Sequence, residues 1–240
     1  MLIDYSRQTE FDSVFDSNLS KDSYHAIIGC GGVGFWLGIM LAMQGYDNLF
    51  LVDGQKLEPT NLNRIPVSPS WDGVNKTIAL RKVIKTLRPL SNVTTISQDV
   101  DKDDLEILEK FIGTLGISSN NAVRWVIWDC TDDARVQRKI FHWKQQYNHV
   151  DYRKIGYEGF QVGTYTNYDV WTTEDYRPGY RASNACAASS MLAAVVGFMA
   201  HGLALDNDIN LNIRNILTDI NKGNRMVRVA PPATKQEVPF

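Results

Sequence analysis

Four glycines between two apolar runs are the first residues whose types and spacing could do chemistry. Gly29, Gly31 and Gly34 have the G-x-G-x-x-G spacing, and Gly32 lies among them. Glycine permits a tight turn and lets a phosphate approach the backbone, and a helix that begins there adds free N–H groups. Asp53 follows about 20 residues later, where an acid can bind ribose hydroxyls. The pattern predicts a site for an adenosine-containing nucleotide, although it does not separate ATP from NAD, and a tight turn without a ligand is the alternative.

A second set of motifs follows in the same half of the chain. The run GQKLEPTNLNR ends at Arg64, Lys76 opens a basic helical segment, and DCTDD occupies residues 129–133. Together with GCGGVG and the VD pair that ends at Asp53, these motifs resemble the ThiF/MoeB/HesA family and the adenylation domains of ubiquitin-activating enzymes in order and spacing. Each motif alone is weak, whereas the combined set is specific.

The resemblance implies an ATP-dependent adenylyltransferase with ATP and Mg²⁺ as cofactors. Such an enzyme activates the C-terminal carboxylate of a small ubiquitin-like or sulfur-carrier protein, or of a peptide, and releases pyrophosphate. Because the reaction requires bound phosphates and an in-line carboxylate, positioned charge does most of the catalysis. Arg64 and Lys76 would contact the phosphates, and Asn61 would orient them by hydrogen bonds. Asp132, just beyond the end of a strand, would hold Mg²⁺ with support from Asp129.

Each of these residues also has an ordinary structural interpretation. Arg64 or Lys76 alone would be a solvated surface charge, and Asp132 alone would be the N-cap of the helix expected over residues 133–146. It is their shared order on one fold that favours the functional interpretation.

The N-terminal segment Tyr5-Ser6-Arg7-Gln8 resembles the YSRQ segment of the family. In the family this arginine reaches the site of the other subunit, so the resemblance implies a homodimer in which Arg7 is catalytic. The clear resemblance covers about residues 1–135, and more weakly the helix after Cys186. An arginine in a chain terminus is otherwise expected to be disordered.

Four positions depart from the family pattern. Gln55 stands where a second acid is usual, Ile65 stands where glutamine usually follows NLNR, and Asp133 replaces an asparagine. Arg135 and Arg138 straddle the place of a family arginine. These changes bear on the rate and on the geometry of the nucleotide, but they leave the central charges in place.

The cysteines predict one candidate nucleophile and no zinc site. Cys186 precedes an expected helix, where a thiolate has a lowered pKa and could take the activated partner as a thioester or persulfide. A small buried residue at the start of a core helix is the alternative. Cys30 and Cys130 are interpreted as packing residues. The paired C-x-x-C motifs that bind structural zinc in many family members are absent, so we expect no zinc.

Alternating apolar runs and helical segments surround these motifs. The expected fold class is α/β: a Rossmann-like, mostly parallel sheet with helices on both faces. The loop over residues 58–73 is too long for an ordinary connection and is expected to be functional. Strands are expected at residues 24–28, 48–52, 93–97, 125–128, 150–155 and 160–165, and helices after the glycine turn to residue 44 and at residues 76–87, 103–112, 133–146 and 185–205.

The 240 residues are expected to form a single adenylation domain over residues 1–240. Within it we expect an N-terminal arm, a nucleotide-binding half, a partner-binding half with the crossover loop, and a tail. Their ranges are 1–20, 21–150, 151–229 and 230–240.

Composition narrows the function classes further. A 44% hydrophobic and 22% charged content with a net charge of −2 indicates a soluble globular protein without a nucleic-acid-binding or membrane surface. The N-terminus lacks the layout of a signal peptide, and three scattered cysteines do not form a disulfide framework, so a cytoplasmic location is expected.

Two rival functions use part of the same pattern. A nicotinamide oxidoreductase would use the glycine loop and Asp53, but it would leave NLNR, Lys76 and DCTDD without a role. A non-catalytic subunit that recruits a ubiquitin-like partner is favoured by Gln55 and Ile65, and it is opposed by the retained Arg64, Lys76 and Asp132.

Overall fold

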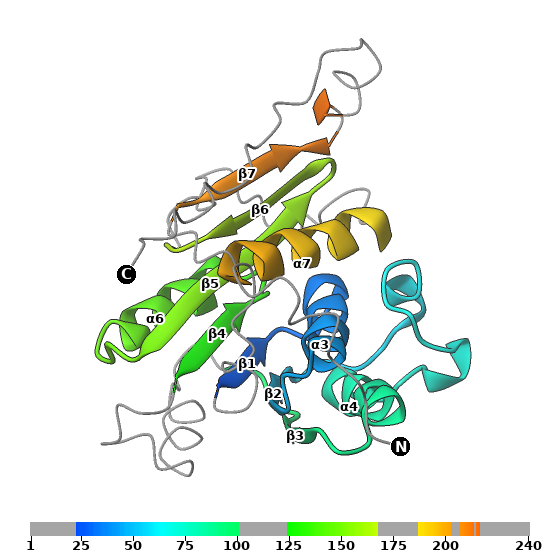
Figure 1. Ribbon diagram of the computed structural model, residues 1–240. Coiled ribbons are helices and arrows are strands. Elements are labelled where there is room, and N and C mark those ends of the chain that lie inside the picture. Colours follow the sequence, from blue (N-terminus) through cyan, green and yellow to red (C-terminus); the bar gives the residue numbers. More distant parts are fainter. Residues whose placement is uncertain (1–22, 101–123, 168–186, 203–206, 214, 217–240) are drawn as a thin grey trace, which may run out of the picture.

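A twisted sheet forms the centre of the computed structural model, which describes residues 23–100, 124–167, 187–202, 207–213 and 215–216. In these ranges the strands form one seven-stranded sheet in the order β3-β2-β1-β4-β5-β6-β7 (Figure 1). The first five strands in this order are parallel, and β6 and β7 add antiparallel neighbours at one edge. The strands are β1 (Tyr24–Ile28), β2 (Asn48–Val52), β3 (Asn92–Ile96), β4 (Trp125–Asp129), β5 (Val150–Glu158), β6 (Gln161–Tyr165) and β7 (Ile209–Asn212).

Helices cover both faces of the sheet, as the sequence predicts. Three helices pack against one face and α6 packs against the other (Figure 1). The helices are α3 (Gly32–Gln44), α4 (Lys76–Leu87), α6 (Ala134–Lys144) and α7 (Ala187–Gly202), and two short 3₁₀ turns, η1 (Pro59–Asn61) and η2 (Pro69–Trp71), lie in the loop before α4. Among the described residues, no helix has the length and apolar character needed to cross a membrane.

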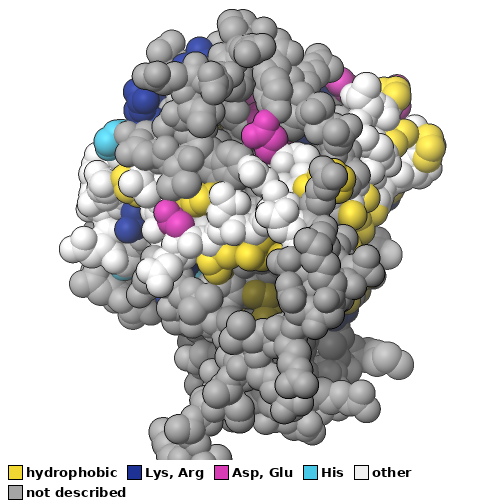
Figure 2. Space-filling model, turned by 90° about the horizontal axis from the view of Figure 1, so that it is seen from above, with side chains coloured by type: hydrophobic (Ala, Val, Ile, Leu, Met, Phe, Trp, Pro, Cys, Tyr) yellow, Lys and Arg dark blue, Asp and Glu magenta, His cyan; other side chains and the backbone are white. Residues whose placement is uncertain are grey.

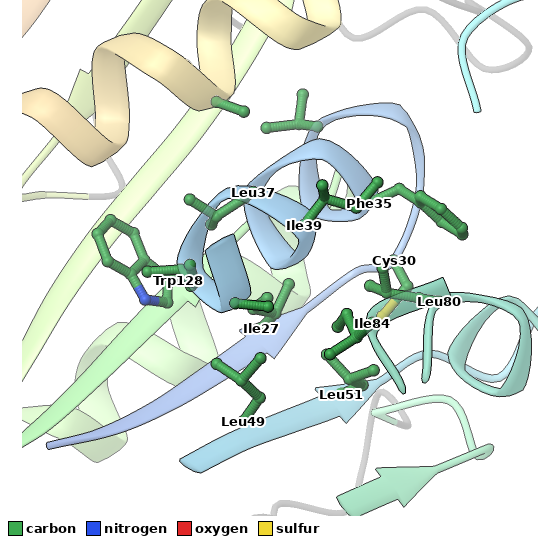
Figure 3. Packing of buried hydrophobic residues seen from close by; sticks show 14 of the residues in the cluster. Ile27, Cys30, Phe35, Leu37, Ile39, Leu49, Leu51, Leu80, Ile84 and Trp128 are labelled. Carbon is green, nitrogen blue, oxygen red and sulfur yellow. The ribbon is translucent and has the colours of Figure 1, made fainter. Parts of the chain in front are cut away.

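Alternation along β1 sends side chains into two separate cores. Ile27 faces α3, α4 and α7, where it packs with residues such as Leu51 and Trp128 (Figure 3). Ala26 and Ile28 face α6. A strand that is buried on both faces has a continuous apolar sequence, as is typical of parallel sheets with helices on each side.

The strand register brings the candidate motifs to one edge of the sheet. Ile28, the last residue of β1, is level with Val52 of β2 and with Asp129 of β4. The glycine turn, the loop after β2 and the turn after β4 therefore all leave the carboxyl ends of neighbouring strands. This is the edge at which open α/β sheets bind ligands.

Most of the expected elements are confirmed within a few residues. Gly45 ends α3 in the left-handed conformation with φ of 92°, as predicted. The helix expected over residues 103–112, the arm over 1–20 and the tail over 230–240 lie outside the described residues. The division of the chain into two halves stays a prediction.

Candidate functional site

At two of its four glycines, the turn after β1 leaves no room for a side chain. A Cβ at Gly34 would overlap the carbonyl oxygen of Gly29, so α3 can begin against the turn only with glycine there. Gly29 has φ of 90°, and a Cβ there would lie 2.8 Å from the carbonyl oxygen of Cys130. A Cβ at Gly31, in contrast, would meet nothing within 4 Å among the described residues. The turn is therefore closed toward the protein and open at Gly31.

Asp53 ties the glycine turn to the loop that follows β2. Its Oδ2 accepts a hydrogen bond from the backbone N–H of Cys30 at 2.8 Å, and its Oδ1 accepts one from the N–H of Gln55 at 2.7 Å. A carboxylate offers about four acceptor positions, so two such bonds leave capacity for a ribose hydroxyl. Burial raises the pKa of Asp53, and the nearby charge of Lys76 opposes that shift.

Arg64 lies over the glycine turn and is held by its own loop. A Cβ at Gly32 would lie 3.0 Å from the Arg64 Cδ, which places the aliphatic part of the side chain against the turn. The Arg64 Nη1 donates to the carbonyl oxygen of Thr60 at 2.8 Å and to the Asn63 Oδ1 at 3.0 Å. The indole N–H of Trp36 donates to the Arg64 carbonyl oxygen at 3.0 Å. Both acceptors of the guanidinium are neutral, and no carboxylate among the described residues forms an ion pair with it.

Lys76 is the first residue of α4 and is only 7% exposed. Its Nζ donates to the Gln55 Oε1 at 2.5 Å, and its backbone N–H donates to the Gln55 carbonyl oxygen at 3.0 Å. Gln55 is one of the departures from the family pattern. Its amide oxygen accepts from the lysine as an acid would but carries no charge of its own, so the only carboxylate charge that the electrostatics assign to this lysine among the described residues is that of Asp53.

Two other residues of this loop, Asn61 and Ile65, stabilise its conformation. Asn61 is 5% exposed, and its Oδ1 accepts from the backbone N–H of Glu58 at 3.1 Å. Ile65, another departure from the family pattern, is 2% exposed and packs in the core beneath α3, α4 and α7.

The turn between β4 and α6 presents Asp132 to solvent. Asp129 is fully buried, and its Oδ1 accepts from the Thr131 backbone N–H at 3.1 Å and from the Thr131 Oγ1 at 2.7 Å. Asp133, not Asp132, is the N-cap of α6, because its carboxylate accepts from the backbone N–H of Arg135. The capping role considered for Asp132 is therefore wrong by one residue. Asp132 is exposed and forms no hydrogen bond with a described residue.

Among the described residues, Arg135, which follows this turn, forms an ion pair, unlike Arg64 and Lys76. The Arg135 Nη2 pairs with the Asp133 Oδ2 at 2.8 Å, so that charge is compensated at the helix start. Burial raises the pKa of Asp129, and hydrogen bonds from Thr131 and Tyr152 oppose that rise. Arg64, Lys76 and Asp132 form no ion pair with any residue in the described ranges.

Contacts link several of the predicted residues directly. Cys30 joins the glycine turn to Asp53, Gln55 joins Asp53 to Lys76, and Gly32 contacts Arg64. Asp132 lies in the turn after β4 at the same edge, and it forms no hydrogen bond or ion pair with the other candidates that the structure describes. Arg7 and Cys186 lie outside the described residues, so their roles stay predictions.

Three residues at this edge were not predicted. Asp99, three residues after β3, lies against Gly54, and its charge raises the pKa of Asp53. A polar residue just after a parallel strand is a signal that could have found it. Tyr152 donates to Asp129, and the Gln137 Nε2 donates to the Thr131 carbonyl oxygen at 2.6 Å. Neither contact has a signal in the sequence, because each depends on how distant segments pack.

Comparison with known proteins gives one family and several distant relatives. The family model described as the ThiF family matches residues 5–212. The "Ubiquitin-like modifier-activating enzyme 5" of Culex quinquefasciatus is 27% identical over 171 residues, which are 70% of this chain and 40% of that protein. The "Molybdopterin-synthase adenylyltransferase" of Haemophilus influenzae is 26% identical over 214 residues, which are 84% of this chain and 81% of that protein.

Solved structures share the fold at low sequence identity. The chain resembles E. coli MccB in complex with MccA-N7isoASN with a TM-score of 0.62 and 18% identity, covering 82% of this chain and 66% of that one. It resembles PaaA with a TM-score of 0.59 and 20% identity, covering 82% of this chain and 62% of that one. The chain thus spans about 40% of the length of the first relative and about two thirds of these structures.

Proposed function

Because this chain belongs to the ThiF family, we propose that it is an ATP-dependent adenylyltransferase. Its substrate is the C-terminal carboxylate of a small ubiquitin-like protein, a sulfur-carrier protein or a peptide, and pyrophosphate is the second product. The observation that carries the proposal is the set of groups at the carboxyl edge: an open glycine turn, two cations with neutral partners and an exposed carboxylate. Similar proteins carry names of the same activity, such as the molybdopterin-synthase adenylyltransferase.

The glycine turn suits the phosphates and the ribose of ATP. The space at Gly31 and the N-terminus of α3 favour an anion that approaches the backbone. Asp53, which bonds the same turn through the Cys30 N–H, keeps acceptor capacity for ribose hydroxyls. Arg64 and Lys76 supply two positive charges whose side-chain hydrogen bonds go to neutral acceptors and which form no ion pair within the described ranges, as suits a triphosphate.

The acid of the β4–α6 turn suits Mg²⁺ bound together with phosphate. Magnesium in nucleotide sites is held by one or two carboxylates and by phosphate oxygens, without a full protein cage. Within the described ranges no three His, Cys, Asp or Glu side chains gather into a metal cluster. Asp132, exposed in the turn after β4, would be the protein ligand, and Mg²⁺, when bound, would reduce the charge on the phosphates.

The reaction requires little covalent chemistry from the protein. A carboxylate oxygen of the partner attacks the α-phosphorus, the bond from that phosphorus to the α,β-bridging oxygen breaks, and pyrophosphate leaves. Arg64 and Lys76 would hold the phosphates so that the departing negative charge stays stabilised. The backbone of the glycine turn would fix the nucleotide for in-line attack.

Exposed apolar side chains support a protein or peptide partner. Hydrophobic side chains gather in the middle and along one side of the face shown in Figure 2. Met191 and Met199 of α7 and Phe160 at the β5–β6 hairpin are exposed among the described residues. Apolar side chains that gather into a contiguous exposed patch can mark a site that binds a partner. One solved structure of this fold, E. coli MccB, was determined together with AMPCPP and MccA.

We further propose the homodimer in which Arg7 enters the neighbouring site. The support is the YSRQ segment, and a two-fold dimer makes the exchange reciprocal. Mixing Arg7→Ala chains with Asp132→Ala chains should restore roughly a quarter of wild-type activity, because half of the dimers then hold one complete site. Recovery should be absent if Arg7 acts within its own chain.

Cys186 is proposed as the residue that accepts the activated partner. Its support is its position before α7. Replacement by serine should leave pyrophosphate exchange intact and block a thiol-linked adduct. If the adduct still forms in Cys186→Ser, the adenylate is passed on without this thiol.

The proposal is tested by ATP–pyrophosphate exchange. The purified chain is incubated with ATP, Mg²⁺ and labelled pyrophosphate, together with small proteins that end in Gly-Gly and are encoded near its gene. Exchange that depends on one of them and on its free C-terminus supports the adenylyltransferase. A stable complex with such a partner but no exchange would instead favour the non-catalytic subunit, for which Gln55 is the supporting observation.

A further inference from the structure

A buried hydrogen-bonded link connects β5 to the turn that carries Asp132. Tyr152 of β5 is 4% exposed, and its hydroxyl donates to the Asp129 Oδ2 at 2.7 Å. The other carboxylate oxygen of Asp129 accepts both bonds from Thr131. Asp129 thus receives hydrogen bonds from both sides, and Thr131, the residue before Asp132, is one of the donors.

A second bond holds the same turn from the helix that follows it. Gln137 of α6 is 5% exposed, and its Nε2 donates to the Thr131 carbonyl oxygen. Asp133 caps α6 one residue beyond Asp132. Thr131 and Asp133 are therefore both fixed, and Asp132 lies between them with its carboxylate exposed.

We propose that Tyr152 is a positioning residue for the magnesium ligand Asp132, acting through Asp129 and Thr131. The proposal rests on the proposed function, because it concerns the acid that would hold Mg²⁺ with ATP. Residues that orient a metal ligand through hydrogen bonds tune its affinity for the metal, although they never touch the ion.

In this link the Tyr152 hydroxyl can act only as the hydrogen-bond donor. Burial raises the pKa of its phenol well above the ordinary value, and the charge of Asp129 adds to that rise. The hydroxyl therefore stays protonated and donates to the carboxylate. Phenylalanine at this position would keep the ring and would leave a buried oxygen of Asp129 without its donor, which is the costly way to lose a hydrogen bond.

The test compares Tyr152→Phe with Tyr46→Phe. Tyr46 is 5% exposed and packs against His25 at the amino end of the sheet, so it offers the same chemical change away from the turn. The dissociation constant of ATP is measured by titration calorimetry with Mg²⁺ and with EDTA, and thermal unfolding is followed for each variant. The ratio of the two constants reports the metal contribution without any turnover.

In Tyr152→Phe the gain in ATP affinity from Mg²⁺ should fall by about tenfold, while ATP binding in EDTA stays at the wild-type value. Tyr46→Phe should keep the wild-type ratio. An unchanged ratio in Tyr152→Phe, with Mg²⁺-dependent binding in the wild type, would overturn this inference alone. Absence of Mg²⁺-dependent ATP binding in the wild type would overturn the proposed function, and the inference with it.

Thr131→Val provides a second variant if Tyr152→Phe does not fold. It removes the Thr131 hydroxyl at the opposite end of the same link and keeps the volume of the side chain. The Mg²⁺ ratio should fall in this variant also. A wild-type ratio in a folded Thr131→Val would overturn the link between Asp129 and the metal ligand.

Discussion

Two groups of polar side chains, one at each end of the sheet, are used in different ways. At the amino end, the His25 Nδ1 accepts from the indole N–H of Trp128 at 3.0 Å, and its Nε2 bonds the Ser23 hydroxyl at 3.1 Å. Arg124 pairs with Asp151 at 2.7 Å beside them. At the carboxyl end, Arg64 and Lys76 have neutral acceptors, and Asp132 is exposed.

This difference separates polar groups that stabilise the fold from charged groups that are available to bind a ligand. Buried polar groups that satisfy one another contribute to stability, and their removal leaves unpaired atoms. Charges that the protein positions without cancelling are instead available to an ion of opposite sign. We therefore expect changes to Arg64, Lys76 and Asp132 to alter activity at nearly constant stability, and changes to the hydrogen-bonded residues of the amino end to do the reverse.

Asp132→Ala should give the largest effect at the carboxyl end. Loss of the metal ligand should lower the rate of ATP–pyrophosphate exchange by about a hundredfold or more, because a bound metal supplies several kcal/mol of charge stabilisation. The melting temperature should stay near the wild-type value. Asp133→Ser is the matched control, because serine keeps the N-cap of α6. Full exchange activity in Asp132→Ala would contradict the assignment.

Arg64→Ala and Lys76→Ala should come next. Each should cost about 2–3 kcal/mol of transition-state stabilisation, measured as a loss of kcat/KM of roughly a hundredfold. Lys82→Ala is the control, since Lys82 is exposed on the same helix as Lys76 and lies over the ring of Trp71. If both variants retain wild-type activity, the phosphates do not bind at this end of the sheet.

The glycine turn allows the two kinds of effect to be separated within six residues. Gly31→Ala should weaken ATP binding by roughly tenfold with little change in melting temperature, because the added methyl would occupy open space that a phosphate needs. Gly34→Ala should instead lower the free energy of unfolding by about 1–3 kcal/mol, because its methyl would overlap the Gly29 carbonyl. Calorimetry and thermal unfolding measure the two. A Gly31→Ala variant that binds ATP normally would show that no phosphate approaches that position.

The smallest effect on activity is expected at the amino end, where the readout is stability against pH. Burial lowers the pKa of His25 and lowers that of His201 to about 4. Both are neutral in the fold, and the unfolded chain takes up protons below about pH 6.5, so these groups make stability fall as the pH drops from about 6.5 to about 4. The raised pKa values of Asp53 and Asp129 act in the opposite sense. The contribution of one histidine is therefore measured by comparing the stability of a variant that lacks it with that of the wild type.

His201→Phe should therefore lose less stability than the wild type over this pH window, by roughly 2–3 kcal/mol at pH 4. Exchange activity at neutral pH should be unchanged. Urea unfolding at several pH values measures the difference. Parallel stability curves for the two proteins would show that His201 does not titrate between the folded and unfolded states.

Local signals in the sequence account for the elements that were predicted well. The glycine spacing, the apolar run before it and Asp53 define a βαβ unit within about thirty residues, and the structure confirms that unit. The contacts among the candidate residues were harder to predict. The bond from Lys76 to Gln55 and that from Tyr152 to Asp129 each join positions more than twenty residues apart. The cap of α6 at Asp133 instead of Asp132 reflects the general imprecision of helix ends read from sequence.

The central claim, that the carboxyl end of the sheet binds ATP with Mg²⁺, is tested most directly by titrating the wild-type chain with nucleotides. ATP and NAD are compared by calorimetry, each with Mg²⁺ and with EDTA, and the ATP titration is repeated with Arg64→Ala. The account predicts that ATP binds, that Mg²⁺ strengthens its binding, that Arg64→Ala weakens it, and that NAD binds at least about tenfold less tightly. NAD binding as tight as that of ATP, or ATP binding indifferent to both Mg²⁺ and Arg64, would contradict it.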